Sequence, residues 1–272
     1  MKPDRAPLWT LRLAPPILTK KLVGLGSMVA VIVIWAIVTA GPSPESRIIS
    51  PVVLPSPFEV LVSFKSLLTE RALLQSIVAT LWRVLLGFGL AIVIGVPLGV
   101  AAGSWRILDA AAAPLALFGR NIPIAALIPL TILWFGIGEA QKVMFIFIAC
   151  APFVFSDTVD AVVGVPDRYV DTAQTLGARS GQVIGKVLVP LAAPGIYNSL
   201  RNLFGLAFGY IMLAELINAK YGLGYLLSTS QRRGLTEHII LILIVIGALA
   251  YGIDRLLYWL QKGFFPYRAE AD

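Results

Sequence analysis

Several charged residues stand inside long apolar runs, and their positions suggest contact with a solute. An ionisable side chain in an apolar environment is expensive to bury unpaired, so it is a functional candidate by default. Arg120 is placed where it could steer an anion. The alternative for each residue is pairing with another polar group or anchoring at an interface. We select as candidates for a solute pathway Arg83, Arg120, Asp157, Arg201 and Glu215.

The inventory of metal-binding and nucleophilic residues is poor. The chain has one cysteine, Cys150, and one histidine, His238. These two residues exclude a disulfide framework and a Cys/His zinc site, and they leave little for acid-base or metal catalysis. We therefore expect no catalytic residues, no metal and no cofactor on this chain.

One segment is superficially similar to a phosphate-binding loop. Residues 181–187 read GQVIGKV. The first glycine is one residue too close to Gly185, and Val187 stands where Ser or Thr should bind magnesium. The sequence therefore excludes nucleotide binding at this segment.

Composition places the chain in a membrane. Hydrophobic residues make up 58% of its 272 residues and charged residues 14%, with a mean hydropathy of +0.84. A soluble protein could not keep so apolar a surface in water. The net charge is +7, and in a membrane protein the Lys and Arg residues behind such a charge are typical of cytoplasmic loops. We therefore do not expect the chain to bind nucleic acid.

Apolar runs predict an all-α integral membrane protein with six core transmembrane helices. A helix needs about 20 residues to cross the hydrocarbon layer. The first run is too long for an ordinary signal peptide, although Val38-Thr39-Ala40 could pass as a cleavage site. The predicted spans cover 22–40, 76–103, 110–136, 143–163, 195–217 and 238–260.

Local features refine two of these spans. The third is interrupted by Arg120, Pro123 and Pro129, and a broken helix at membrane depth is tolerated where it faces protein or a cavity. The second carries a face of small residues on which another helix can pack closely. Its members are Gly87, Gly89, Gly95, Gly99 and Gly103.

The segments between the spans are also informative. Residues 41–57 are rich in proline and predict an irregular connector on the outer side. Residues 58–74 have the spacing of an amphipathic surface helix, and 104–109 form a short cytoplasmic loop. The spacing Gly205-x3-Gly209 in the fifth span is a helix-packing signal.

Six spans put both termini on one side. Lys and Arg are more numerous in the N-terminal tail and the loops on its side than in the opposite loops, so that side is the cytoplasm. We expect a basic cytoplasmic tail at 1–21, a single transmembrane domain at 22–262 and a cytoplasmic tail at 263–272. The polar loop 165–194 then lies in the cytoplasm.

Loop 165–194 predicts a compact helix-turn-helix. Asp167 begins a short helix to Leu176, where its carboxylate suits the positive end of the helix dipole. Gly177 ends that helix because glycine reaches left-handed backbone angles without penalty. Ser180 begins a second helix, which we expect Pro190 to stop.

The spacing within this loop resembles a known family. Asp171-Thr172-Ala173-x3-Gly177-x9-Val187-x-Val189-Pro190 is similar to the EAA loop of the permease subunits of ABC importers, with Ala173, Gly177 and Pro190 identical. In that family the loop forms a coupling helix that docks on an ATPase. The resemblance implies that the contact includes Asp171, Thr172, Ala173, Leu176, Gly177, Ala178 and Pro190.

Further stretches resemble the taurine, sulfonate and nitrate branch of the family. They lie at 54–61, 120–142 and 214–227. The resemblance implies a subunit that pairs with a second permease copy, two cytoplasmic ATPases that hold ATP and Mg, and an extracytoplasmic substrate-binding protein. It also implies a bacterial inner-membrane location and a small anion such as a sulfonate, taurine, nitrate or bicarbonate as solute.

Two other classes were weighed. A secondary transporter or channel should show ionisable relays in mid-span and inverted repeats, and the sequence shows few of the former and no evident repeat. A membrane-embedded enzyme should show clustered His, Asp or Glu residues for metal or acid-base catalysis. This chain has one histidine and so offers few such residues.

Overall fold

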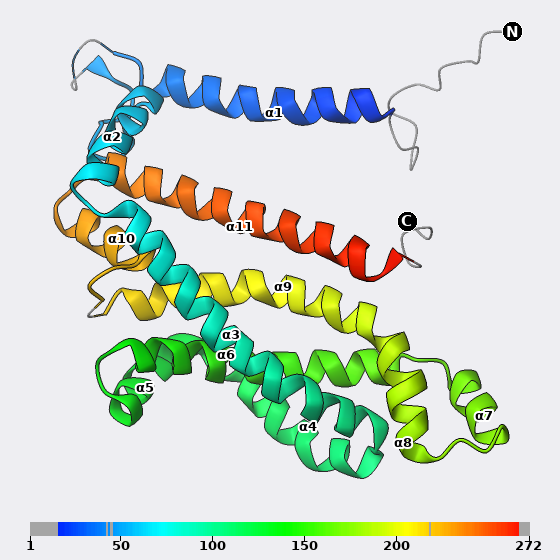
Figure 1. Cartoon of the computed structure of the whole chain (residues 1–272). Helices are drawn as coiled ribbons and strands as arrows, with labels where there is room; N and C mark the ends of the chain where they lie inside the picture. The colour runs from blue at the N-terminus through cyan, green and yellow to red at the C-terminus, as the bar shows by residue number, and fades with distance from the viewer. Residues whose placement is uncertain (1–15, 42, 44–45, 218, 267–272) are drawn as a thin grey trace, which may run out of the picture.

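The long apolar runs form helices of membrane-crossing length. The computed structural model describes residues 16–41, 43, 46–217 and 219–266, and its regular elements there are all helical (Figure 1). Among these residues five helices are long and apolar enough to cross a membrane, and a bent pair makes a sixth. The expected all-α fold is confirmed. The helices that hold the long spans are α1 (Ile17–Val38), α3 (Leu73–Ser104), α6 (Glu139–Val163), α9 (Val189–Glu215) and α11 (Thr236–Phe264).

The bent pair is the interrupted third span. It consists of α4 (Arg106–Asn121), a short 3-10 turn η2 (Ile124–Ala126) and α5 (Leu127–Phe135), with a bend of 89°. The break falls before Pro123, which lacks an N–H and forces the preceding residue into an extended conformation. Pro129 does not interrupt the span because it lies in the first turn of α5, where an N–H is not needed.

The loop expected at 104–109 is much shorter in the structure. Because α3 runs to Ser104 and α4 begins at Arg106, only Trp105 separates them. The carboxylate of Asp109 lies in the first turn of α4, where it suits the helix dipole. The sequence-based boundary at residue 110 was therefore wrong by one helical turn.

Helix α3 packs against α6 through its glycines, as predicted. A Cβ added at Gly87 would lie 2.5 Å from the carbonyl oxygen of Val143, and one at Gly99 would lie 2.6 Å from Cβ of Thr158. Gly95 and Gly103 meet α6 in the same way, whereas a Cβ at Gly89 meets nothing within 4 Å. Four of the five predicted glycines therefore allow the close approach, and Gly89 does not take part.

Short helices lie at the end of the bundle that the sequence predicts to be outside. Helix α2 (Pro57–Thr69) begins with a capping box between Ser56 and Glu59. It ends before residue 74, where we expected its end, because Ala72 takes a left-handed conformation (φ 53°) and α3 follows directly. Helix α10 (Leu223–Arg232) lies at the same end (Figure 1).

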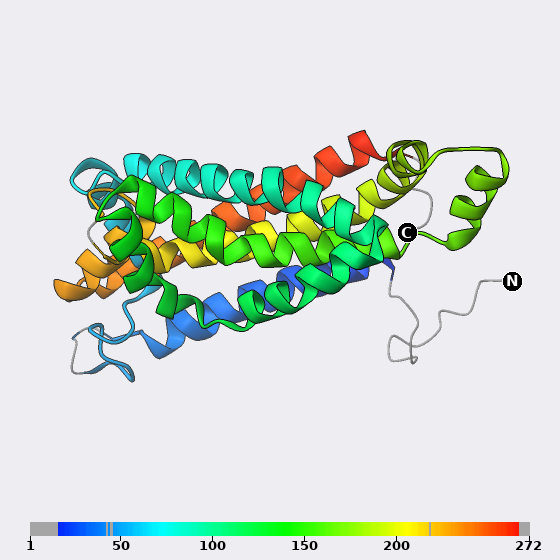
Figure 2. The ribbon, with the colours of Figure 1, turned by 90° about the horizontal axis from the view of Figure 1, so that it is seen from below.

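The opposite end, called here the α7 end, carries α7 (Asp167–Thr175) and α8 (Ser180–Val183). Figures 1 and 2 show both helices projecting beyond the long helices, at the end where α1 begins and α11 finishes. This arrangement agrees with the predicted even number of crossings. Of the expected tails 1–21 and 263–272, residues 1–15 and 267–272 lie outside the described residues, while α1 already begins at Ile17 and α11 extends to Phe264.

Helix α1 lies at the edge of the bundle (Figure 1), and none of its apolar stretch is buried. Trp35 of α1 donates a hydrogen bond of 2.9 Å from Nε1 to the carbonyl oxygen of Pro55. A helix so apolar and so exposed is suited to contact lipid.

Pro190 does not stop the second helix of the loop, contrary to our expectation. Helix α8 continues through a π-helical stretch η3 (Ile184–Leu188) into α9, so 180–215 form one run of 36 residues. The wider π turn allows the chain to pass a proline that supplies no N–H. The predicted start of the fifth span at residue 195 was therefore too late.

The packing signal at Gly205 and Gly209 has no partner within the described chain. Both residues are exposed on α9, and a Cβ added at either meets nothing within 4 Å. The buried face of α9 is formed instead by Phe204 and Phe208, and Phe204 packs edge-on against Phe88 of α3 with ring centroids 5.7 Å apart.

Candidate functional site

The corner between α7 and α8 is built around Gly177. This glycine has φ +80°, and its N–H donates to the carbonyl of Gln174 while the N–H of Ala178 donates to the carbonyl of Ala173. These two bonds define a Schellman motif, which satisfies the carbonyls at the end of a helix. Gly177 therefore ends the helix as predicted, and only a glycine takes this conformation without strain.

Small apolar residues fix the corner to the bundle. Ala173 and Ala178 pack against a cluster of buried residues that is separate from the main core. The cluster is made by Val162, Val165, Val183, Leu188, Ala192 and Ile196. Ala173, Gly177 and Ala178 thus shape the corner, and their spacing has a structural cause within this chain.

Other residues of the predicted coupling set face away from the protein. The side chain of Leu176 is 82% exposed at the tip of the corner. Asp171 is exposed, and its side chain makes no ion pair or hydrogen bond with any described residue. Thr172 donates to the carbonyl of Arg168 at 2.6 Å, and Pro190 is exposed. The corner therefore presents an exposed leucine and a free carboxylate to a partner.

A cluster of charges at the outer end, called here the outer charge cluster, is fully paired. Arg83 of α3 is buried and donates from Nη1 to Glu215 of α9 at 2.7 Å and from Nε to Glu139 of α6 at 2.6 Å. Its Nη1 also donates to the carbonyl of Tyr221, and Thr80 donates to Glu215 at 2.8 Å. The cluster ties three long helices to the α9–α10 connection.

Glycines bring the α9–α10 connection close to the outer charge cluster. A Cβ added at Gly222 would lie 2.4 Å from the carboxyl carbon of Glu215, and the φ of Gly222 is +143°. The N–H of Gly224 donates to Glu215 at 3.0 Å. Space and backbone conformation therefore both require glycine at residue 222.

Arg120 and Asp157 form a much looser pair. The shortest approach is 4.0 Å, from Nη2 of Arg120 to Oδ1 of Asp157, and the two side chains are 36% and 26% exposed. The guanidinium carbon lies 5.1 Å from the ring centroid of Phe153, within the range of a cation-π contact. The side chain of Arg120 makes no hydrogen bond to any described residue.

Arg201 of α9 has a full partner on α11. Its Nε and Nη2 donate to the two oxygens of Asp254 at 2.6 and 2.8 Å, and its guanidinium lies 4.8 Å from the ring centroid of Tyr258. A small cavity of about 220 Å³ adjoins this pair. Arg201 therefore links α9 to α11 through this ion pair.

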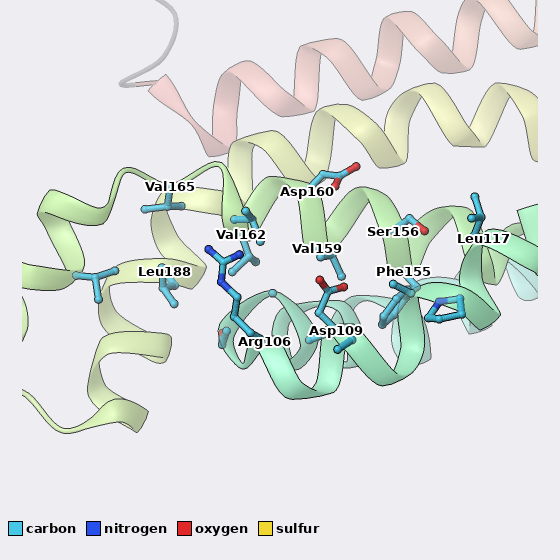
Figure 3. Close-up of a pocket in the computed structure, with 18 of the residues that line it drawn as sticks. Arg106, Asp109, Leu117, Phe155, Ser156, Val159, Asp160, Val162, Val165 and Leu188 are labelled. Carbon is cyan, nitrogen blue, oxygen red and sulfur yellow. The ribbon is translucent and has the colours of Figure 1, made fainter.

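A larger cavity of about 820 Å³ lies at the α7 end (Figure 3). Arg106 and Asp109 project from α4 toward Val162 and Val159 of α6, and the cavity extends along α4 as far as Arg120. Val165 and Leu188 border it beside the corner, so it lies between the broken span and the corner.

The structure brings together some of the predicted pathway residues and adds partners that the sequence reading missed. Arg83 meets Glu215, and Arg120 meets Asp157. Glu139 and Asp254 were not singled out. Glu139 lies in stretch 120–142, which resembles the taurine, sulfonate and nitrate branch, so the resemblance could have identified it as a candidate. No feature of the sequence near Asp254 distinguished that residue.

A bundle of membrane-crossing helices with an exposed, ordered corner at one end defines a multi-pass membrane protein that works with a partner. Residues 95–266 match the family described as "Binding-protein-dependent transport system inner membrane component". The chain belongs to this family and is a non-catalytic permease subunit of an ABC importer.

Named relatives agree with this assignment. The taurine transport system permease protein TauC of Escherichia coli is 28% identical over 261 residues, which are 94% of this chain and 93% of TauC. The bicarbonate transport system permease protein CmpB of Synechococcus elongatus is 30% identical over 194 residues, 71% of this chain and 70% of CmpB. Family membership decides against the secondary transporter and the membrane enzyme.

A solved structure shares the fold. One chain of an inward-facing structure of the MetNI methionine ABC transporter superposes with a TM-score of 0.62 at 22% identity, over 71% of this chain and 96% of that chain. At this identity the match shows the fold alone.

Proposed function

We propose that this permease imports a small anion of the sulfonate, taurine, nitrate or bicarbonate class and that loop 165–194 couples it to ATP hydrolysis. The solute class is supported by relatives whose names specify taurine and bicarbonate transport. The coupling role is supported by the shape of the corner. Its small residues fix its backbone, while Leu176 and Asp171 remain available to a partner.

The exposed leucine at the tip of the corner is the observation that carries the proposal. A large apolar side chain that is 82% exposed beside a rigid turn is suited to fill a pocket on another protein. A structured corner also transmits displacement better than a mobile loop would. The partner is a cytoplasmic ATPase.

The complete transporter contains two such permease chains and two ATPase subunits, with ATP and Mg held by the ATPases. An extracytoplasmic substrate-binding protein delivers the solute to the outer end. The chain lies in the bacterial cytoplasmic membrane with both termini in the cytoplasm. ATP-driven closure of the ATPases moves the docked corners, and the long helices alternate between outward and inward openings.

The experiment replaces the exposed leucine. Leu176→Asp places a charge at the tip without disturbing a contact inside the chain, so we expect normal folding and an ATPase association weakened about tenfold or more. Leu176→Met is the matched control that keeps an apolar side chain and should retain association. ATPase copurification and ATP-driven uptake of labelled taurine and bicarbonate into proteoliposomes are measured.

Coupling through the corner is rejected if the wild-type chain purifies without ATPase subunits or if Leu176→Asp couples like the wild type. Gly177→Asp gives a second test because it strains the Schellman turn. Unchanged uptake by that variant would also contradict the proposal. A coupled wild type that transports neither labelled compound, nor ethanesulfonate or nitrate, would reject the solute class.

A further inference from the structure

The described Arg-carboxylate pairs differ sharply in geometry. The pairs of Arg47, Arg83 and Arg201 approach within 2.6 to 2.9 Å. Arg120 approaches its carboxylate no closer than 4.0 Å, and its side chain makes no hydrogen bond to any described residue. A guanidinium carries five N–H donors in a rigid fork, so Arg120 has unused donor capacity.

The position of Arg120 exposes that capacity to a cavity. Arg120 stands in the last turn of α4, immediately before the 89° break, and lines the cavity of about 820 Å³. Its guanidinium carbon lies 5.1 Å from the ring centroid of Phe153. A cation-π contact engages the charge of the guanidinium and requires none of its N–H groups as hydrogen-bond donors, so those donors remain available.

Charges elsewhere in the cavity do not account for Arg120. Arg106, Asp109, Asp160 and Asp167 also line the cavity. Arg106 and Asp109 stand in the first turn of α4, about 16 Å or more along the helix axis from Arg120. Asp160 lies about one turn beyond Asp157 toward the α7 end. The carboxylate within ion-pair distance of Arg120 is therefore Asp157.

We propose that Arg120 binds the oxyanion group of the transported solute and that Asp157 is the counter-ion this group displaces. The inference rests on the proposed function and names the contact within the pathway. The guanidinium edge matches an oxyanion that presents two oxygens side by side, as a sulfonate, a carboxylate or bicarbonate does. Asp157 neutralises Arg120 while the site is empty, and its long, partly exposed contact is weak enough to yield to the solute.

The first experiment measures KM and kcat for uptake of labelled taurine, ethanesulfonate and bicarbonate. Proteoliposomes contain the complete transporter, and the binding protein is added. Arg120→Gln should raise KM about tenfold or more because it removes a charge-assisted contact. Asp157→Asn should lower KM about threefold because it removes the competing carboxylate. Arg120→Lys should show an intermediate KM because it keeps the charge and loses the fork.

The expected changes in KM have opposite signs for Arg120→Gln and Asp157→Asn, and this distinguishes a solute-binding role of the pair from a purely structural one. A merely structural pair predicts that Arg120→Gln and Asp157→Asn impair uptake alike. Glu59→Gln, in the Arg47–Glu59 pair on the outer surface, is the matched control that should leave KM unchanged. If both pathway variants raise KM, or if neither moves it, the inference is overturned while anion transport stands. A coupled wild type that transports none of the anions overturns both.

A second experiment uses the single native cysteine, Cys150, which is buried. Arg120→Cys should raise KM, and a cationic aminoethyl methanethiosulfonate should lower it again by restoring a positive charge. The anionic sulfonatoethyl reagent should not restore uptake. The wild-type transporter treated with each reagent controls for cysteines of the other subunits. Equal effects of the two reagents on Arg120→Cys would overturn the proposal even if the substitution lowers protein yield.

Discussion

Arg83 and Arg120 both stand in apolar helices, and the structure treats them differently. Arg83 is buried and uses four hydrogen bonds, to two carboxylates and one carbonyl. Arg120 is partly exposed in a cavity and has one carboxylate at 4.0 Å. The sequence proposed both arginines as pathway candidates and favoured Arg120, but it did not show which of them has hydrogen-bond partners.

Hydrogen-bond satisfaction, rather than charge in an apolar run, distinguishes the roles of such residues. A buried arginine with all its partners holds helices together, and losing one partner leaves an uncompensated charge. An arginine with unused donors can accept a ligand without first breaking the fold.

The largest effect is expected for Glu215→Ala. The substitution leaves Arg83 without its buried carboxylate and removes the acceptor for Thr80 and for the N–H of Gly224. Breaking a buried pair in this way costs about 3–5 kcal/mol of stability. Thermal unfolding of the detergent-solubilised protein measures the loss.

Glu139→Ala is the matched control for Glu215→Ala, because Glu139 contacts the same arginine with a side chain that is 67% exposed. We expect a smaller loss of stability from it. Equal losses for the two variants would show that burial of the carboxylate does not set the contribution of the pair.

A smaller effect on stability is expected for Arg120→Gln. Its pair with Asp157 is long and partly exposed, so its removal should cost less than about 1 kcal/mol. Arg83→Gln, measured by the same thermal assay, provides the contrast. A loss for Arg120→Gln as large as that for Arg83→Gln would erase the distinction between the two sites.

The smallest effect on stability is expected for the Arg47–Glu59 pair. This pair has good hydrogen-bond geometry without burial, so it tests whether geometry alone makes a pair stabilising. It is bidentate, at 2.9 and 3.1 Å, but lies at the surface. The hydrogen bond from Arg47, with help from the N–H of Ser56, lowers the pKa of Glu59 from 4.5 to about 2. A carboxylate with a lowered pKa stabilises the fold above its unfolded pKa, and that contribution is lost as the pH falls from about 4.5 toward 2.

Melting temperature measured between pH 6 and pH 3 tests this contribution. The wild type should lose slightly more stability than Glu59→Gln over that range, because glutamine retains the helix cap and does not titrate. Parallel curves for the two proteins would mean that the surface pair adds nothing.

Much of the fold was readable because its causes are local. Apolar runs predicted the membrane-crossing helices, Gly87 and Gly99 predicted a close contact with another helix, which the structure identifies as α6, and Pro123 predicted the broken span. Gly177 likewise predicted the end of α7. Each feature follows from the length, size or backbone freedom of nearby residues.

The features that were missed depend on distant parts of the chain. The missed partners are Glu139, 56 residues from Arg83, and Asp254, 53 residues from Arg201, so their identity is set by the order and rotation of helices rather than by local spacing. Pro190 was expected to end a helix because the π turn before it leaves no clear pattern in the sequence. The exposure of Arg120 to a cavity likewise depends on how α4 lies against α6.

The continuous helical run from Ser180 to Glu215 connects the corner at the α7 end with the outer charge cluster at the other end. The run is not straight, because α8 lies across the axis of α9 (Figure 1). The π turn at 184–188 and Pro194 are its irregular points, and both lie near the α7 end. Beyond Pro194 the helix continues without a break to Glu215, about 32 Å further along its axis. A displacement of the corner can therefore reach the outer charge cluster along this helix only through residues 184–194, so the stiffness of that short stretch sets how much of the displacement arrives.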